Sequence, residues 1–332
     1  MEQTLKAYLD SLAVGPVQSH LNLTVFPLLS DKASTLDYLT LDDALSLKLI
    51  TVTEVSEGGS VPELSVLNTS ATMVLILDGE ELVGAKQNRI VNTTILIAAG
   101  AKTKIPVSCV EQGRWTYDSP VFRSEGRVMS SKMRGSKAEQ VKFSLKASGR
   151  FASDQGAIWE DISDLAHTRC AVSPSMAMSA IYKKERSRLE DYSSKFGAVE
   201  AQVGAVFVID GRIAGMDCFG KQETFGKVFQ KLIESYALDA VDTAGNGRMA
   251  DPGTASAVGS FVKGCAGCRV ESRPSVGLGT DCRLESPDAT GFALVHKGQL
   301  LHMSVFGKKS GNGVGQPFAR LLRASRRERR LL

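Results

Sequence analysis

The chain has 332 residues with 43% hydrophobic content, which is enough to bury a sizeable core in one large domain or two modest ones. The formal net charge of +4 is small for this length and does not by itself indicate nucleic-acid binding. No run of about 18 apolar residues and no secretory signal pattern occurs, so we expect a cytoplasmic protein without a membrane segment. The six cysteines are too scattered for a disulfide framework, and we expect them to be reduced thiols.

The chain before residue 78 predicts short strands with two short helices among them. Leucines recur at helical spacing near the N-terminus, and two Asp residues follow Leu41, where a helix start favours negative charge. The helices are expected at 5–12 and 41–47, and the strands at 21–29, 49–55, 63–68 and 72–77. Strands about ten residues apart, joined by turn signals, favour an antiparallel sheet or sandwich over alternating strands and helices.

The stretch from Asp78 to Trp115 is the predicted functional site, because polar side chains gather at three corners between short apolar strands. The corners hold Asp78, Glu80 and Glu81; Lys86, Gln87, Asn88, Arg89 and Asn92; and Glu111, Gln112, Arg114 and Trp115. Carboxylate, amide, guanidinium and indole groups together suit a polar ligand that carries a flat ring. Solvated hairpin ends are the alternative interpretation.

Each group has an expected role if the corners meet in one pocket. The candidate catalytic carboxylates are Glu80, Glu81 and Glu111, of which Glu111 or Glu80 would act as the base. Asp78, with the two neighbouring glutamates, could offer oxygens to Mg²⁺, although nothing in the sequence requires a metal. For each acidic residue taken singly, a surface carboxylate or a structural ion pair is the alternative.

The remaining polar residues of the stretch are expected to bind the ligand. Anions would be held by Lys86, Arg89 and Arg114, and polar edges would be bound by the amides of Gln87, Asn88, Asn92 and Gln112. The Trp115 indole could stack on a base. A phosphate-bearing small molecule is therefore the expected partner.

The same stretch resembles the signature of the ARG-and-rhodanese-phosphatase-associated protein domain, a prokaryotic family named for its gene neighbours. The specific blocks are GEELVGAKQNR and IPVSCVEQGRW; supporting blocks are HLNLTVFPLL, YLTLDDAL, VPELSVLN, GAVFVIDGRIAGMDCFG and LHMSVF, spread over most of the chain. The resemblance implies metabolism or repair that involves ADP-ribose or related nucleotides, without an established reaction.

The segment from Arg114 to Arg150 differs from what precedes it in its charge. It holds nine basic and three acidic residues, a surplus of six positive charges, with Ser and Gly interspersed. Such a composition is typical of a solvated, mobile loop. The alternative is a lid or basic rim that attracts phosphate-bearing ligands to the neighbouring site.

The second half of the chain predicts helices followed by paired strands. Helices are expected from residue 158, after Pro174, and at 225–240 and 255–263; hairpins at 204–218 and 291–306; and further strands at 270–278 and 281–285. The helix at 225–240 fits the 3.6-residue period throughout, so its aromatic residues are assigned to the core. The Asp210-Gly211 step suits a type I′ turn in the first hairpin.

The elements together predict an α+β fold, in which a β-rich half built as an antiparallel sheet or sandwich precedes an antiparallel sheet with helices on one face. We assign the β-rich part with the polar signature to residues 1–150 and the α+β part to 151–310, either as two domains or as one continuous domain. Residues 311–332 form a strongly basic tail, for which a solvated segment is favoured over contact with nucleic acid.

Two classes of function remain open from the sequence. The first is a hydrolase or transferase that acts on a phosphate-bearing nucleotide or ADP-ribose derivative through a carboxylate, Lys and Arg site. The second is a non-catalytic module that binds such a derivative with the same residues. Nucleic-acid binding through residues 114–150 and the basic tail is a further alternative, and it predicts steep salt dependence.

Overall fold

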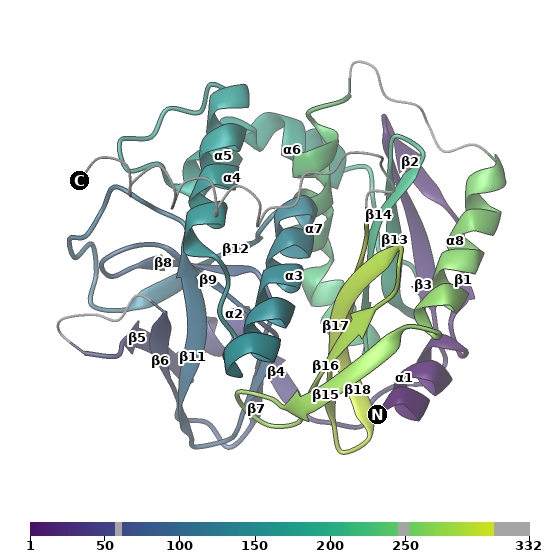
Figure 1. Cartoon of the computed structure of the whole chain (residues 1–332), viewed down its shortest axis with the longest axis horizontal. Helices are drawn as coiled ribbons and strands as arrows, with labels where there is room; N and C mark the ends of the chain where they lie inside the picture. The colour runs from purple at the N-terminus through teal and green to yellow at the C-terminus, as the bar shows by residue number, and fades with distance from the viewer. Residues whose placement is uncertain (57–61, 245–251, 309–332) are drawn as a thin grey trace, which may run out of the picture.

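The computed structural model describes residues 1–56, 62–244 and 252–308, and the strands of this part form three sheets (Figure 1). The basic tail at 311–332 lies outside the described residues. Helices and mainly antiparallel strands occur together, so the predicted α+β class is confirmed.

Two sheets of the first half enclose an apolar core. The six-stranded sheet has the order β12 (Phe122–Val128), β8 (Glu80–Gly84), β9 (Arg89–Val91), β11 (Lys102–Cys109), β6 (Glu63–Asn68) and β5 (Ile50–Glu54). The three-stranded sheet has the order β10 (Ile95–Ile97), β7 (Met73–Ile76) and β4 (Tyr38–Thr40), and it packs on the first sheet together with α2 (Leu41–Ser46). Side chains such as Val66, Val74 and Val91 fill the space between the sheets, as expected of a sandwich.

The third sheet has nine strands and combines the two ends of the chain. Its order is β1 (Ala13–Val14), β3 (Leu23–Leu29), β13 (Gln202–Ile209), β14 (Arg212–Phe219), β18 (Gln299–Gly307), β17 (Ala289–His296), β16 (Thr280–Glu285) and β15 (Arg269–Pro274), while β2 (Gln18–His20) pairs with β3. Strands from the first thirty residues therefore lie in the sheet that residues 202–307 build. Both predicted hairpins, β13–β14 and β17–β18, are confirmed.

Helices cover both faces of the nine-stranded sheet, so the expected arrangement on one face is wrong. Along β13, Phe207 points to α7 (Gln222–Ala240), where its ring stacks on Tyr236 at 3.8 Å between centroids. The alternate residues Val206 and Val208 belong to a second core with α1 (Glu2–Leu9) and α8 (Pro252–Cys265). In Figure 1, α7 lies between the sheets and α8 on the outer side.

The predicted loop between residues 114 and 150 is wrong over most of its length, because it contains β12 and the 18-residue helix α3 (Ser131–Ser148). The Ser130 hydroxyl caps the helix by accepting a hydrogen bond from the backbone N–H of Met133, and Gly149 ends it in the left-handed conformation. Only residues 112–121, named here the Trp115 loop, connect β11 to β12 without regular structure.

Three further helices extend the layer beside α7. They are α4 (Gln155–Thr168), α5 (Met178–Lys184) and α6 (Arg186–Ser193). The single helix expected after Pro174 is divided at Glu185, where α5 ends and α6 begins. In the part of the chain that the structure describes, none of the helices combines the length and the apolar character needed to cross a membrane.

Candidate functional site

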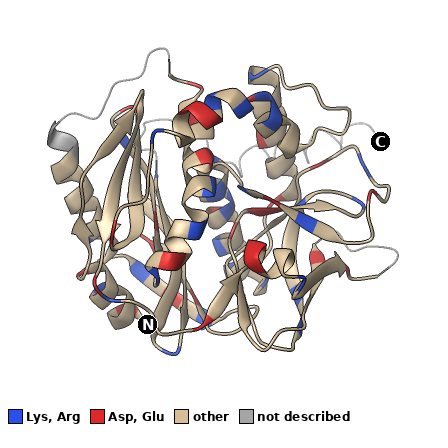
Figure 2. Ribbon diagram, turned by 180° about the vertical axis from the view of Figure 1, so that it is seen from behind, with Lys and Arg blue, Asp and Glu red and all other residues tan. Residues whose placement is uncertain are grey.

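Most of the basic residues in 114–150 form ion pairs within the fold. Arg134 and Lys137 of α3 are buried, and Lys142 donates to Glu285 at 2.6 Å. Figure 2 shows acidic and basic residues interspersed over the helices and strands. The segment therefore does not form the free basic rim that the sequence suggested.

The predicted metal ligand, Asp78, lies in the core. Lys137 donates to one of its carboxylate oxygens and to the carbonyl of Val91 at 3.0 Å, while the Nε atom of Arg134 is 3.9 Å from the other oxygen. Burial lowers the pKa of the Lys137 ammonium group, although Asp78 opposes the effect. Because this ammonium group occupies Asp78, and no group of three metal-ligating side chains occurs among the described residues, a Mg²⁺ site lacks a donor set there.

The same core holds a second charged network that sequence reasoning missed. Arg134 donates to both oxygens of Asp217, at 2.6 and 3.2 Å, and the hydroxyls of Tyr236 and Ser304 donate to them at 2.8 and 2.5 Å. Burial opposes ionisation of Asp217, but the guanidinium group and a contact from His302 hold its pKa well below the usual range. Since all five side chains are buried, the network joins α3 to the nine-stranded sheet.

Glu80 is also removed from the surface. Lys231 of α7 donates to it at 2.6 Å and lies equally close to Asp42, and the backbone N–H of Leu77 donates to its second oxygen at 2.8 Å. Burial raises the pKa of Glu80, which the Lys231 charge opposes. Both oxygens are thus engaged in a structural contact between α7 and β8.

Glu81 differs from its neighbour because it has no hydrogen-bond partner on either oxygen and is fully buried. Burial raises its pKa to about 8; the positive charge of Arg127 opposes this, while Glu125 and Glu111 add to it. The side chain is therefore a neutral acid at neutral pH. Among the candidate carboxylates, it is the one with neither oxygen held by a hydrogen-bond donor of the protein.

Glu111 joins the second and third corners of the predicted site. Arg114 donates to its Oε2 atom at 2.7 and 2.9 Å, the backbone N–H of Asn88 donates to the same oxygen at 3.1 Å, and the hydroxyl of Ser175 donates to Oε1 at 2.6 Å. Burial acts to raise the pKa of Glu111, but the hydrogen bonds from these donors outweigh it, so the pKa lies below its usual value. Arg114 also donates to the carbonyl of Ala85 at 2.6 Å, which fixes the start of the Trp115 loop.

Cationic and aromatic side chains meet where the Trp115 loop packs on Lys86 and on the buried Arg89. We name Lys86, Trp115 and Tyr117, together with Arg89 beneath them, the aromatic–cationic surface. The Lys86 ammonium nitrogen lies 5.4 Å from the ring centroid of Trp115 and 5.1 Å from that of Tyr117. These rings are 45% and 55% exposed, which is high for large aromatic groups in a folded chain. The predicted ligand-binding residues Lys86, Arg89 and Trp115 are thus brought together.

A close backbone approach allows this loop to pack against β8. Gly84 has a φ of +130°, and a Cβ atom there would lie 2.7 Å from the carbonyl oxygen of Val121 and 2.6 Å from the hydroxyl of Ser119. Only glycine fits this position, since both the conformation and the space exclude a side chain.

Arg89 lies beneath Trp115, with its guanidinium carbon 5.6 Å from the ring centroid. Its Nη1 atom donates to Gln87 at 2.7 Å and to the sulfur of Cys109 at 2.6 Å, while Nε and Nη2 have no hydrogen-bond partner. Glu54 of β5 is 3.9 Å from Nη2 and was missed by sequence reasoning. Glu54 follows Ile50 and Val52 at two-residue spacing, so it lies on the same face of β5 as these core residues. This spacing is the signal that could have placed Glu54 beside Arg89.

The other predicted amides are divided between the core and the surface. Asn92 accepts a hydrogen bond from Ser108 at 2.8 Å and donates to the carbonyl of Phe151 at 3.1 Å, so it joins β9 to the start of the helical layer. The Asn88 side chain accepts from Arg114 at 3.1 Å, and Gln112 is exposed on the Trp115 loop. The bonds of Asn92 thus run to Ser108 and Phe151 and to no residue of the aromatic–cationic surface.

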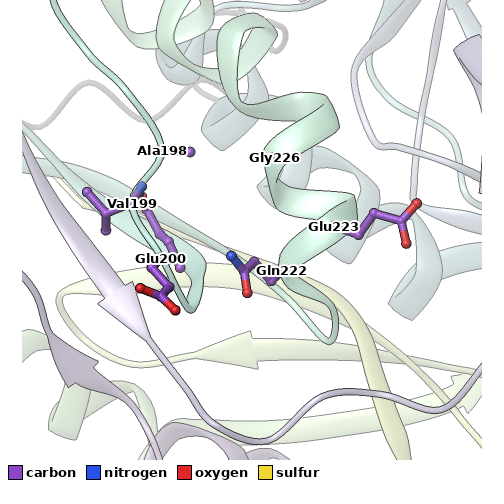
Figure 3. A pocket seen from close by; sticks show the side chains of 7 residues that line it. Ala198, Val199, Glu200, Gln222, Glu223 and Gly226 are labelled. Atoms are coloured by element: carbon purple, nitrogen blue, oxygen red, sulfur yellow. The ribbon is translucent and has the colours of Figure 1, made fainter.

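Two cavities of about 550 Å³ lie elsewhere. The first opens at the start of α7, where Gln222 and Glu200 approach from facing elements and Glu223 points away (Figure 3). Its charged lining groups are carboxylates, so it offers no cation to a phosphate. The second lies between β5 and β12, beside Asp42, and neither cavity is lined by a predicted site residue.

The family comparison agrees with the blocks identified in the sequence. The model of the ARG and Rhodanese-Phosphatase-superfamily-associated Protein domain matches residues 11–306. Neither the curated proteins nor the solved structures yielded a match to the chain.

Proposed function

The chain belongs to the family of the ARG and Rhodanese-Phosphatase-superfamily-associated Protein domain, and from this premise we propose that it binds a phosphate-bearing small molecule of the nucleotide or ADP-ribose type at the aromatic–cationic surface. A cytoplasmic setting forms part of the proposal, since all six cysteines carry free thiols.

The observation that carries the proposal is the gathering of two exposed rings and two cations. Lys86 lies within 5.4 Å of both ring centroids, and Arg89 is 5.6 Å from that of Trp115. An aromatic face provides stacking for a base, and a cation beside it attracts a phosphate group. Isolated surface lysines or aromatics occur on many proteins, but the combination suits a ligand that contains both a ring and an anion.

The neighbouring Glu111–Arg114 pair holds the aromatic–cationic surface in position and does not itself contact the ligand. Glu111 accepts from the backbone N–H of Asn88 at 3.1 Å and from the Ser175 hydroxyl at 2.6 Å, and these bonds hold the start of the Trp115 loop against the residue before β9 and the segment before α5. A preorganised loop lowers the entropic cost of ligand binding. We therefore assign Glu111 and Arg114 a positioning role and give Lys86 and Trp115 the direct contacts.

Fluorescence provides a direct test, because the chain contains only two tryptophans. In the variant Trp159→Phe, Trp115 is the sole indole, and titration with ADP-ribose, AMP and pyrophosphate should change its emission. The matched variant Trp115→Leu should bind the ring-bearing ligands about tenfold or more weakly, in line with the cost of losing one stacked base. Saturable binding that is unaffected by this variant, or no binding of any of these ligands, would refute the proposal.

Hydrolysis or group transfer is the second candidate function, and Glu81 is the specific observation in its favour. A buried acid with a pKa of about 8 and no internal partner resembles the proton donors of acid–base enzymes. Glu80 and Glu111 are less suited to proton transfer, since their oxygens are engaged by Lys231 and Arg114.

The catalytic proposal is tested by Glu81→Gln, with Glu111→Gln as the comparison. If Glu81 donates a proton, its amide variant loses turnover of the bound nucleotide derivative while ligand affinity is kept. Unchanged turnover in Glu81→Gln would remove Glu81 from the proton transfer, and absence of turnover in the unaltered protein would leave the chain as a binding module. A loss of affinity in Glu111→Gln, with turnover reduced only in proportion, would agree with a positioning role for that residue.

A further inference from the structure

The buried pair of Glu54 and Arg89 has an unused set of hydrogen-bonding atoms. The side chains are 5% and 0% exposed, and the shortest distance between their charged atoms, from Nη2 to Oε1, is 3.9 Å. Both oxygens of Glu54, and both Nε and Nη2 of Arg89, lack a hydrogen-bond partner. A direct charge-assisted bond would be about 2.7–2.9 Å long, so the pair stands apart by roughly 1 Å.

This arrangement is unfavourable in a core, because a buried polar group without a partner has lost its hydrogen bonds to water and gained none in the protein. The other side of the guanidinium group is well engaged, since Nη1 donates to Gln87 and to Cys109. Arg89 is thus held in a fixed orientation, with its second edge directed away from these contacts. The free edge offers two parallel donors, and Glu54 offers two acceptors beside it.

The unpaired atoms of Glu54 and Arg89 suit some chemical groups of a ligand better than others. A phosphate would suit the Arg89 donors, but it brings no donor for Glu54 and is repelled by its negative charge. Neighbouring hydroxyl groups suit both, because each hydroxyl donates one hydrogen bond and accepts others. Two adjacent hydroxyls can donate to the two oxygens of one carboxylate and still accept from a guanidinium edge. A carboxylate binds ribose hydroxyls in the same manner in dinucleotide-binding folds.

The pair lies beside the groups that would hold the base and the phosphate of a nucleotide. Arg89 and Lys86 are 5.6 and 5.4 Å from the centroid of the Trp115 ring, so a ribose at Arg89 would be close to a base stacked on Trp115 and to a phosphate at Lys86. From this juxtaposition we infer that Glu54 and Arg89 bind the 2′- and 3′-hydroxyls of a ribose, and that Glu54 makes the protein selective for ribonucleotides over deoxyribonucleotides. The inference rests on the proposed function and names the part of the ligand that this site selects.

Access to the pair passes the Trp115 loop. Arg89 is fully covered, whereas the Trp115 ring above it is 45% exposed and borders the solvent. The sugar reaches the two side chains when the Trp115 side chain moves from its position over Arg89. Ribonucleotide binding therefore changes the surroundings of this indole more than deoxyribonucleotide binding does.

The experiment compares ADP, 2′-deoxy-ADP and 3′-deoxy-ADP on Trp159→Phe protein by Trp115 fluorescence, with calorimetry on the unaltered chain. Each missing hydroxyl leaves a buried acceptor without its donor, so each deoxy ligand should bind about tenfold or more weakly than ADP. In Glu54→Gln the difference between ADP and its deoxy forms should fall below about threefold, because the amide offers one acceptor in place of two. The control Glu63→Gln, on the neighbouring strand β6, should keep the full discrimination.

The outcomes separate the inference from the proposal on which it rests. Equal affinities for ADP and both deoxy forms in the unaltered protein would overturn the ribose site and leave nucleotide binding intact. Discrimination that persists in Glu54→Gln would also overturn it, since the hydroxyls would then be bound elsewhere. Absence of binding by all three ligands would refute the proposed function itself. The deoxy comparison needs no variant, so it decides the question even if Glu54→Gln does not fold.

Discussion

The buried acid Glu81 predicts an unusual dependence of stability on pH. Its folded pKa of about 8 lies above the usual 4.5 for glutamate. As pH rises from 4.5 to 8, the unfolded chain releases this proton while the folded chain keeps it, so the free energy of unfolding falls. At about 1.4 kcal/mol per pKa unit, the difference between 4.5 and about 8 corresponds to roughly 5 kcal/mol at most.

Replacing Glu81 by Gln removes this titration and keeps the shape of the side chain. We expect the variant to be close to the unaltered protein in stability near pH 4.5 and more stable by several kcal/mol at pH 8, with the gap widening by about 1.4 kcal/mol per pH unit in between. Urea unfolding from pH 4.5 to 8.5 measures the gap. The exposed Glu139 of α3 provides the control, since Glu139→Gln removes a carboxylate without changing the core.

A gap between Glu81→Gln and the unaltered protein that stays constant over this pH range would refute the reasoning, because it would mean that Glu81 ionises alike in the folded and unfolded chains. A gap that narrows with rising pH would be stronger evidence against it. In that case a partner such as Arg127 would have to stabilise the Glu81 carboxylate more than burial penalises it.

Three further predictions concern the contacts around the site. Asp217→Asn leaves the buried charge of Arg134 without its counter-ion, so unfolding in urea should show a loss of about 3–5 kcal/mol; a loss below about 1 kcal/mol would contradict the assigned pair. Glu111→Gln weakens the contact with Arg114 that holds the start of the Trp115 loop. Trypsin should then cleave this loop about tenfold faster, because losing one charged hydrogen bond makes opening of the loop easier by about this factor. An unchanged cleavage rate would show that other contacts hold the loop. Gly84→Ala combines a positive φ with a clash against Val121, and it should lower stability by about 1–3 kcal/mol in thermal melts, together with a change in Trp115 emission.

Elements that depend on local pattern were predictable from the sequence. The helix α7 has apolar residues at every turn, and the β13–β14 hairpin has an Asp-Gly turn between two apolar runs. Asp210 and Gly211 both adopt positive φ there, as a type I′ turn requires. In these segments the side-chain period and the turn residues indicate the same structure, so no distant contact is needed to decide it.

The helix α3 was not predictable in this way, because part of its buried face is charged. Arg134 and Lys137 lie on that face beside Met133 and Val141, so the apolar stripe is interrupted and the composition is that of a loop. The counter-ion of Arg134 is Asp217, 83 residues away along the chain, and that of Lys137 is Asp78, 59 residues away. A charge can replace an apolar residue in a core only when such a partner meets it, and the pairing is visible only in the folded chain.

Partners in the folded chain also separate the structural residues of the predicted site from the residues that we propose bind a ligand. Glu80 and Glu111 have their oxygens occupied by protein donors, and their clustering in the sequence reflects contacts between elements. The two oxygens of Glu54 and the free edge of Arg89 have no such partner, although burial makes each unmet group costly. Arg134 Nε and one oxygen of Asp78 also stand 3.9 Å apart, but the other oxygen of Asp78 is bonded by Lys137. Glu54 has no donor on either oxygen, so a ligand with two hydroxyl groups would complete both the carboxylate and the guanidinium edge.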